Sequence, residues 1–110
     1  MQKTHITDTQ VAWEDLGDGI RRKIMAYNET MMLTKVQFAT GAIGTLHQHP
    51  HTQVAYVSKG IFDIDIEGVI KRLYAGDVYF VPSGLVHGAV CIEAGELIDI
   101  FTPMRADFIQ

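Results

Sequence analysis

The sequence contains a single cysteine, Cys91, among its 110 residues, so it cannot form an internal disulfide. This scarcity of cysteine is typical of a reducing compartment. No apolar run approaches the roughly 18 residues that a membrane-spanning helix needs. The first ten residues also lack the apolar stretch of a signal peptide. We therefore expect a cytoplasmic protein that does not engage a membrane.

Positive charge is also scarce. Nine lysines and arginines stand against thirteen aspartates and glutamates, which gives a formal charge of −4 and an isoelectric point near 5.6. Proteins that bind nucleic acid usually present an excess of cations to the phosphate backbone. We therefore expect no nucleic-acid partner. The chain is 47% hydrophobic and has the length of one folding unit, so a single domain over residues 1–110 is expected.

Helical periodicity is absent, and a strand pattern takes its place. Within residues 61–67, Phe62, Ile64 and Ile66 alternate with acidic residues, which is the two-residue period of a half-buried strand. Similar β-rich runs lie between Gly, Pro, Asn or Asp residues. The eight expected strands are residues 20–27, 31–38, 52–58, 61–67, 69–74, 77–81, 86–93 and 96–101. This pattern predicts an all-β fold, an antiparallel β-barrel or jelly roll whose interior can hold one ligand.

Histidines gather in one short segment. His47, His49 and His51 alternate with other residues, and Gln53 follows in step. Alternate residues of an extended chain share a face, so these four side chains are expected to point together into the barrel. His87 begins another predicted strand and can join them. Neutral imidazoles are common ligands of transition metals, which favours a metal site. From this pattern alone, surface or hydrogen-bonded core histidines stay an alternative.

The spacing of these histidines resembles the two motifs of the cupin family, G(X)5HXH(X)3-4E(X)6G and G(X)5PXG(X)2H(X)3N. Residues 41–60 match the first motif and residues 76–91 match the second. Two positions depart from the family pattern, with Gln53 in place of Glu and Cys91 in place of Asn. The resemblance implies a single-domain cupin of the jelly-roll type.

The resemblance also implies one divalent transition metal, which could be Ni, Zn, Mn, Fe or Co. The implied ligands are His47, His49, Gln53 and His87. With three neutral imidazoles and a neutral amide, the cation keeps its full double charge and attracts an anionic substrate. The alternative, a degenerate site that has lost its metal, stays open, as does the role of His51. A buried structural thiol is expected at Cys91.

An acidic residue interrupts the last predicted strand. Asp99 shares a face with Leu97 and Phe101, and burial of a carboxylate is costly without a partner. The usual reasons for such a residue are a cation, a metal or a catalytic role. Arg105 is the nearest candidate partner. A plain salt bridge between Asp99 and Arg105 and a functional pair are both open.

The resemblance extends to one group of small cupins. It rests on residues 10–17, 22–29, 47–53 and 98–108. Members of this group convert 4,5-unsaturated monouronates, from pectin or alginate breakdown, to linear keto forms such as 5-keto-4-deoxyuronate. The resemblance implies catalytic roles for Asp99, Arg105 and Phe101: proton transfer, bidentate binding of the substrate carboxylate, and packing against the sugar ring, respectively. It also implies a homodimer formed through residues 1–30.

Three alternatives to this function stay open. The first is another metal-dependent cupin enzyme acting on a small acid, a dioxygenase or an isomerase. The second is a non-catalytic sugar-binding cupin, such as the sensor of a transcription regulator. The sequence argues against a regulator because it is acidic and contains no helix-turn-helix segment. The third is a structural barrel without a metal.

Overall fold

Antiparallel pairing links all the strands of the computed structural model, which describes residues 3–109. The strands of this described part are β1 (Glu14–Gly17), β2 (Ile20–Tyr27), β3 (Met32–Phe38), β4 (Ile43–His47), β5 (Thr52–Ile66), β6 (Val69–Tyr74), β7 (Val78–Val81) and β8 (His87–Thr102). Two short 3-10 helices, η1 (Asp8–Gln10) and η2 (Ala106–Phe108), lie near the ends of the chain. The predicted all-β class is confirmed. No helix within residues 3–109 is long and apolar enough to cross a bilayer.

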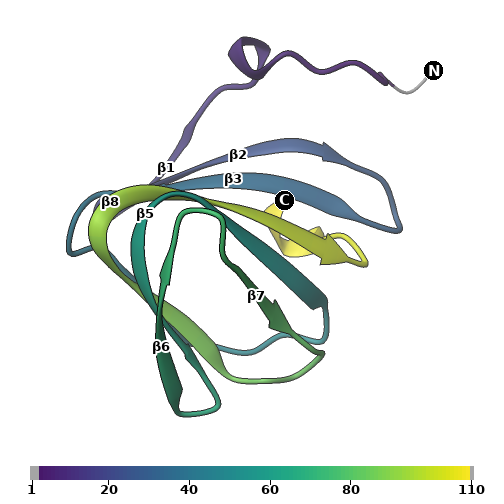
Figure 1. Cartoon of the computed structure of the whole chain (residues 1–110). Helices are drawn as coiled ribbons and strands as arrows, with labels where there is room; N and C mark the ends of the chain where they lie inside the picture. Colours follow the sequence, from purple (N-terminus) through teal and green to yellow (C-terminus); the bar gives the residue numbers. More distant parts are fainter. Residues whose placement is uncertain (1–2, 110) are drawn as a thin grey trace.

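The two long strands, β5 and β8, hold the sheet together. The order along the sheet is β1-β2-β3-β8-β5-β6, while β4 pairs with β8 and β7 pairs with β5. Figure 1 shows β5 and β8 curving from the side formed by β2 and β3 to the side formed by β6. The sheet therefore folds over on itself and encloses an interior, as the jelly-roll expectation required.

Each long strand joins two segments that the sequence pattern had separated. Residues 52–58 and 61–67 were expected to be two strands, but β5 runs through them with shifts of register around Lys59. Gly60 lies at this corner with a φ of +81°, and a Cβ there would come within 2.5 Å of the Glu93 carbonyl oxygen. The glycine therefore marks a bend between closely packed strands rather than a hairpin turn. β8 likewise passes through the predicted break near Gly95.

The sequence pattern does not predict β1 and β4, for the same reason in both cases. All four residues of β1 are exposed, and β4 shows no alternation of buried and exposed residues. Neither strand therefore carries the two-residue pattern by which the others were found. β1 is held at the edge of the sheet by β2, and β4 is held by β8.

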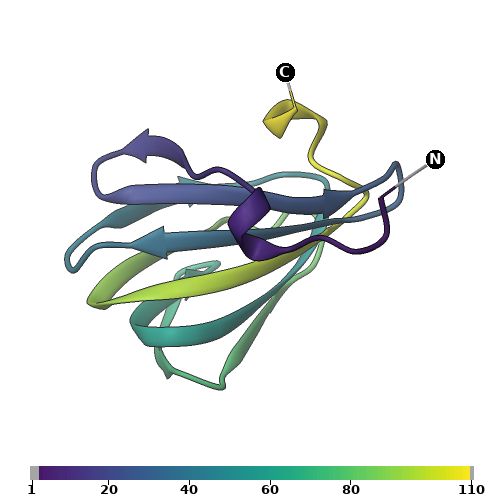
Figure 2. The same cartoon turned by 90° about the horizontal axis from the view of Figure 1, so that it is seen from above.

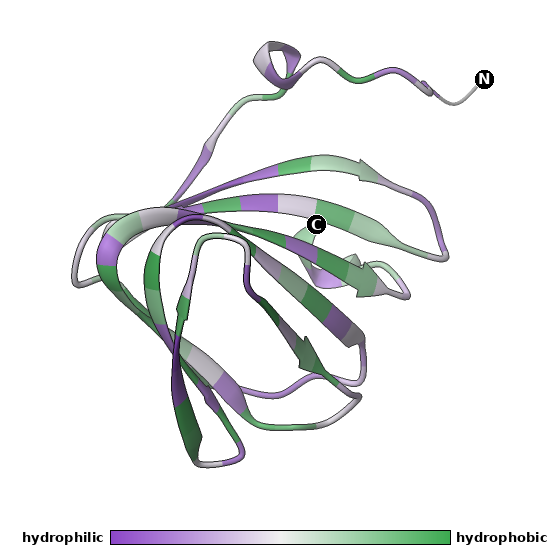
Figure 3. Ribbon diagram, in the orientation of Figure 1, coloured by the Kyte–Doolittle hydropathy of each residue, from purple (hydrophilic) through white to green (hydrophobic). Residues whose placement is uncertain are grey.

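Hydrophobic and hydrophilic residues alternate along the strands (Figure 3). The side chains that point inward change from apolar to polar along the barrel. One inward row is apolar and contains Val36, Leu97 and Val57, which are register neighbours on β3, β8 and β5. The next inward row places Thr34 beside Asp99, and the row beyond it places Phe101 beside Gln53. The fold thus provides an apolar core at one level and buried polar side chains at the next.

The N-terminal segment lies across the outside of the barrel, beside β2 and β3 (Figures 1 and 2). Asp8 receives salt bridges from Lys23 at 3.2 Å and from Lys35 at 3.0 Å. Lys23 is only 5% exposed because this segment covers it.

Candidate metal centre

Three of the predicted ligands meet at one end of the barrel. His47 ends β4 and is the register partner of His87, which begins β8. His49 comes from the connection between β4 and β5. One ligand atom from each of these three histidines lies within 4.8 Å of the others. The expectation that all of these side chains share one extended strand is wrong, because the chain leaves the strand after His47 and re-enters one at Thr52.

Backbone carbonyls fix the orientation of the three rings. His47 Nδ1 is 2.8 Å from the Thr45 carbonyl oxygen, and His87 Nδ1 is 2.9 Å from that of Leu85. His49 Nδ1 is 3.1 Å from the carbonyl oxygen of His51. A carbonyl can only accept a hydrogen bond, so each Nδ1 donates and each Nε2 carries the lone pair. Metal-binding histidines are commonly oriented in this way.

Gln53 brings an amide oxygen to the same place. Its Oε1 lies 3.1 Å from His49 Nε2 and 3.2 Å from His87 Nε2. Its Nε2 donates instead to the Asp99 carboxylate at 3.3 Å. Asp99 therefore determines which end of the amide faces the histidines. The result is a group of acceptor atoms that converge with no hydrogen between them, which is the donor set of a cation site.

Burial sets the protonation states of this group. It lowers the pKa of both His49 and His87, and the Arg105 guanidinium acts in the same direction on His49. These rings are therefore neutral at pH 7 and can act as ligands. Burial also raises the pKa of Asp99 to about 7, although the Gln53 hydrogen bond and Arg105 oppose the rise. Asp99 can thus either hold or release a proton near neutral pH.

The salt bridge that the sequence suggested between Asp99 and Arg105 is not formed. Arg105 instead donates from Nε and Nη2 to the Asp107 carboxylate, at 3.0 and 2.8 Å. Asp107 is only two residues away, so this pair forms with little ordering of the chain. Asp99 keeps Gln53 as its hydrogen-bond partner. The carboxylate is therefore buried, at 8% exposure, without a direct ionic partner in the described part of the chain.

Phe101 connects the last strand to the histidines. Its ring packs edge-on against His49, with centroids 5.8 Å apart, and against Phe108 at 5.7 Å. The Arg105 guanidinium carbon lies 5.1 Å from the centroid of Phe101. Phe101 is 3% exposed, which leaves little of its surface for the sugar contact that the resemblance implied. Its present contacts position His49 and Arg105.

His51 and Cys91 stand apart from the ligand set. His51 packs against His49 at a centroid distance of 5.4 Å, and its Nδ1 is buried without a hydrogen-bond partner within residues 3–109. Cys91 is 1% exposed in the apolar core, and burial raises the pKa of its thiol. The expected structural thiol agrees with this position.

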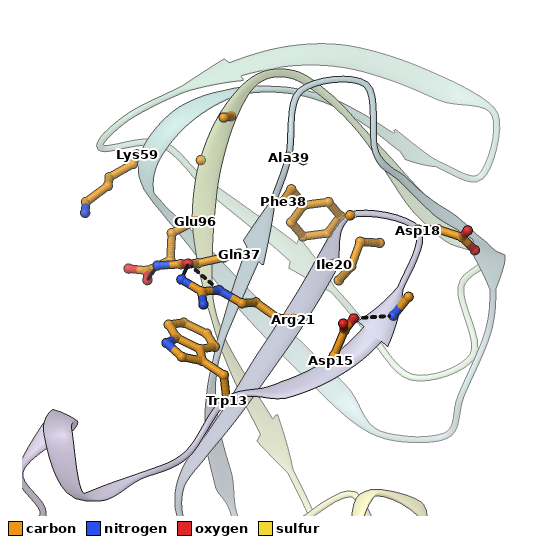
Figure 4. A pocket seen from close by; sticks show the side chains of 14 residues that line it. Trp13, Asp15, Asp18, Ile20, Arg21, Gln37, Phe38, Ala39, Lys59 and Glu96 are labelled. Carbon is orange, nitrogen blue, oxygen red and sulfur yellow. Dashed lines mark hydrogen bonds between the residues drawn. The ribbon is translucent and has the colours of Figure 1, made fainter.

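One cavity of about 370 Å³ contains the site. Its lining includes His47, Gln53, His87, Asp99, Phe101 and Arg105, together with Arg22, Tyr79 and Phe108. No pattern in the sequence points to these last three residues as parts of the site. A second hollow of about 730 Å³ lies on the outer side, beside Trp13, Arg21 and Glu96 (Figure 4). That hollow is open and holds no cluster of metal-ligating side chains among the described residues.

A model of the cupin domain matches residues 34–101, which is more than half of the chain. The chain belongs to the cupin family. This cupin is 46% identical to the pectin degradation protein KdgF of Dickeya dadantii (strain 3937), over 97% of this chain and 99% of the relative.

Two solved structures share the fold of this cupin over nearly its full length. KdgF from Halomonas sp. superimposes with a TM-score of 0.92 at 38% identity, covering 97% of this chain and 99% of that chain. An RmlC-like cupin from Shewanella frigidimarina NCIMB 400 superimposes with a TM-score of 0.93 at 45% identity, covering 97% of each. The expected family and fold are therefore confirmed.

The converging donors of this cupin should bind a divalent metal ion in solution. His87→Ala removes one of the donors, and its affinity for Ni²⁺ or Zn²⁺ should fall by about 100-fold or more. Isothermal titration of the chelator-treated protein measures this change. His5→Ala is the control, because His5 is exposed and lies outside the cluster. Equal affinities of His87→Ala and wild type would contradict the assigned centre.

The raised pKa of Asp99 predicts a pH-dependent stability in the metal-free cupin. The folded state retains a proton that the unfolded state releases, so the wild type loses stability as the pH rises from about 4 to about 7. Asp99→Asn lacks this loss. Its free energy of unfolding should exceed that of the wild type by a margin that grows over this window to roughly 4 kcal/mol. Urea unfolding at a series of pH values measures the margin.

Asp63→Asn is the matched control, because the pKa of Asp63 is shifted in the opposite direction to that of Asp99. Arg72 lowers the pKa of Asp63, so the stability contributed by this pair is present at neutral pH and is lost on acidification. The difference between Asp63→Asn and wild type should therefore shrink as the pH falls. A margin for Asp99→Asn that does not vary with pH would show that Asp99 titrates normally.

Proposed function

We propose that this cupin is a metal-dependent enzyme that opens 4,5-unsaturated monouronates from pectin or alginate breakdown into linear keto forms. The proposal is carried by a cluster of three histidines at a cavity whose lining includes His47, His87, the buried carboxyl of Asp99 with a pKa of about 7, and Arg105. The likeness to two KdgF proteins over nearly the whole chain supports it. The scarcity of cysteine favours a cytoplasmic location.

The substrate determines what the cavity must provide. A 4,5-unsaturated uronate is a cyclic hemiacetal whose C4=C5 enol ether is conjugated with a carboxylate. Ring opening removes the proton of the anomeric hydroxyl and breaks the bond between C1 and the ring oxygen, which leaves as an enolate. Addition of a proton at C4 then converts this enolate into the C5 carbonyl. The reaction therefore needs a group that moves protons near pH 7 and a site that binds an anion.

The metal would be held by His47, His49, His87 and Gln53. When bound, a divalent cation at this position supplies a Lewis acid that stabilises negative charge on substrate oxygens. The donor set accepts Ni, Zn, Mn, Fe or Co. Within this arrangement, Gln53 contributes the neutral amide oxygen, and Asp99 keeps that oxygen facing the histidines.

Asp99 moves the protons in this proposal. Its carboxyl lies in the cavity, and its pKa of about 7 allows it to accept a proton from the anomeric hydroxyl and to return one to C4. Arg105 binds the substrate carboxylate by charge-assisted hydrogen bonds. Phe101 keeps His49 and Arg105 in place through its ring contacts.

Turnover of freshly released 4,5-unsaturated galacturonate tests this function. The ultraviolet absorbance of the conjugated double bond should decay faster than the spontaneous background. Chelation should abolish the acceleration and a divalent metal should restore it. Asp99→Asn should retain its metal but lose about 100-fold or more in rate, because a general acid–base residue contributes roughly 10²- to 10⁴-fold. Full activity of metal-loaded Asp99→Asn would contradict proton transfer, and turnover that consumes oxygen would favour a dioxygenase.

We also propose that two copies of this cupin associate through an apolar face on the outside of the sheet. The face consists of Val54 and Tyr56 on β5, Val78 and Phe80 on β7, and Ile98 on β8. Tyr56, Val78 and Phe80 are 43%, 53% and 56% exposed, which is unusual for neighbouring apolar residues of a monomer. A two-fold pair buries the same face on each copy. This face lies outside residues 1–30, the segment through which the sequence resemblance implied a homodimer.

Light scattering of the protein in solution measures this association. The wild type should have the mass of a dimer, and Phe80→Lys should shift the population toward the monomer, because it places a charge inside the face. Ile70→Lys is the control, since Ile70 is 63% exposed on β6 and lies outside the face. A dimer of Phe80→Lys as stable as that of the wild type would exclude this surface.

A further inference from the structure

A second arginine, Arg22 on β2, faces the cavity. Arg22 on β2 is the register partner of Val36, whose side chain belongs to the apolar inward row. The Arg22 side chain is 13% exposed and lines the same cavity as His47, Asp99 and Arg105. Its neighbour Arg21 points the other way, to the outer hollow, where it donates to Gln37 (Figure 4). Arg22 therefore belongs to the interior of the site.

Phe108 contacts both of the arginines that line the cavity. The guanidinium carbon of Arg22 lies 3.9 Å from the centroid of Phe108, and that of Arg105 lies 4.2 Å from it. The aromatic ring holds each cation by cation–π attraction. Two positive charges are thus kept close together in the cavity lining, which also includes Asp18 and Asp99. The pair of guanidinium groups attracts an anion to this part of the cavity.

The two arginines differ in the donors that they leave free. Asp107 already occupies Nε and Nη2 of Arg105. Arg22 has one contact with a carboxylate, from Nη2 to Glu14 at 3.4 Å. Its Nε is buried and has no hydrogen-bond partner in the described part of the chain. A buried donor without a partner costs free energy, and a ligand that accepts its hydrogen bond removes the cost.

We propose that Arg22 is a specificity-determining residue that donates from Nε to the carboxylate of the uronate. Arg105, which also contacts Phe108, then supplies a second positive charge for this carboxylate. The inference rests on the proposed function, because it assigns a partner to the carboxylate of that substrate. It also explains how the cavity distinguishes an acidic sugar from a neutral one, since a neutral sugar leaves the buried donor with a weaker acceptor.

Kinetics of Arg22→Gln test the assignment. The KM for 4,5-unsaturated galacturonate should rise by roughly 10- to 100-fold, the effect of losing a charge-assisted hydrogen bond, while kcat changes less. Arg21→Gln is the matched control, one residue away and outside the cavity, and should behave as the wild type. Arg22→Lys keeps the charge without the Nε donor and should give an intermediate KM. It also serves as the test if circular dichroism shows that Arg22→Gln is unfolded.

Binding of saturated sugars gives a readout independent of turnover. Titration with D-galacturonate should show a weaker affinity for Arg22→Gln than for wild type by a similar factor, with unchanged metal content. The weak binding of D-galactose should not change. Wild type without turnover would refute the proposed function itself. Wild-type turnover with an unaltered KM in Arg22→Gln, or in Arg22→Lys if only that variant folds, would refute the role of Arg22 alone.

Discussion

The site depends on one constraint, the orientation of three imidazole rings by backbone carbonyl groups. Each Nδ1 donates to a carbonyl two residues away, so that each Nε2 presents a lone pair toward the same point as Gln53 Oε1. Acceptors held this close repel one another unless a cation lies between them. The pairing of β4 with β8 brings His47 to His87, and the connection before β5 adds His49. The barrel therefore carries an electrostatic cost that a metal ion relieves.

Two factors set the charge around this centre: the burial of Asp99, and the contacts of Arg22 and Arg105 with carboxylates outside the cavity lining. Asp99 holds the Gln53 amide in place, and burial raises the pKa of its carboxyl to about 7. Glu14 and Asp107 contact Arg22 and Arg105 from their exposed sides, at 46% and 54% side-chain exposure. Arg22 and Arg105 therefore bring two positive charges to the cavity, whose lining also includes Asp18 and Asp99, although the whole chain has a formal charge of −4. The cavity suits a small anion, while the protein as a whole does not suit a polyanion.

Local patterns in the sequence predict the parts of this arrangement that depend on one strand. The alternation within residues 61–67 and the shared face of Leu97, Asp99 and Phe101 are present in the structure. The motif spacing also predicts that His47, His49 and His87 meet. The remaining features depend on pairing between distant parts of the chain or on competing partners, which the local sequence pattern does not reveal. β1 and β4 are recruited by their neighbours, and Arg105 pairs with Asp107 instead of Asp99. Arg22 becomes part of the site only because β2 packs beside β3.

A crystal structure with bound metal and D-galacturonate tests the central claim most directly, if anomalous scattering is measured at the absorption edge of the metal. The account predicts one anomalous peak at the point shared by His47 Nε2, His49 Nε2, His87 Nε2 and Gln53 Oε1. It also predicts that the uronate carboxylate faces Arg22 and Arg105. An ordered histidine cluster without an anomalous peak, in crystals soaked with the metal, would contradict the claim that this end of the barrel is a metal centre.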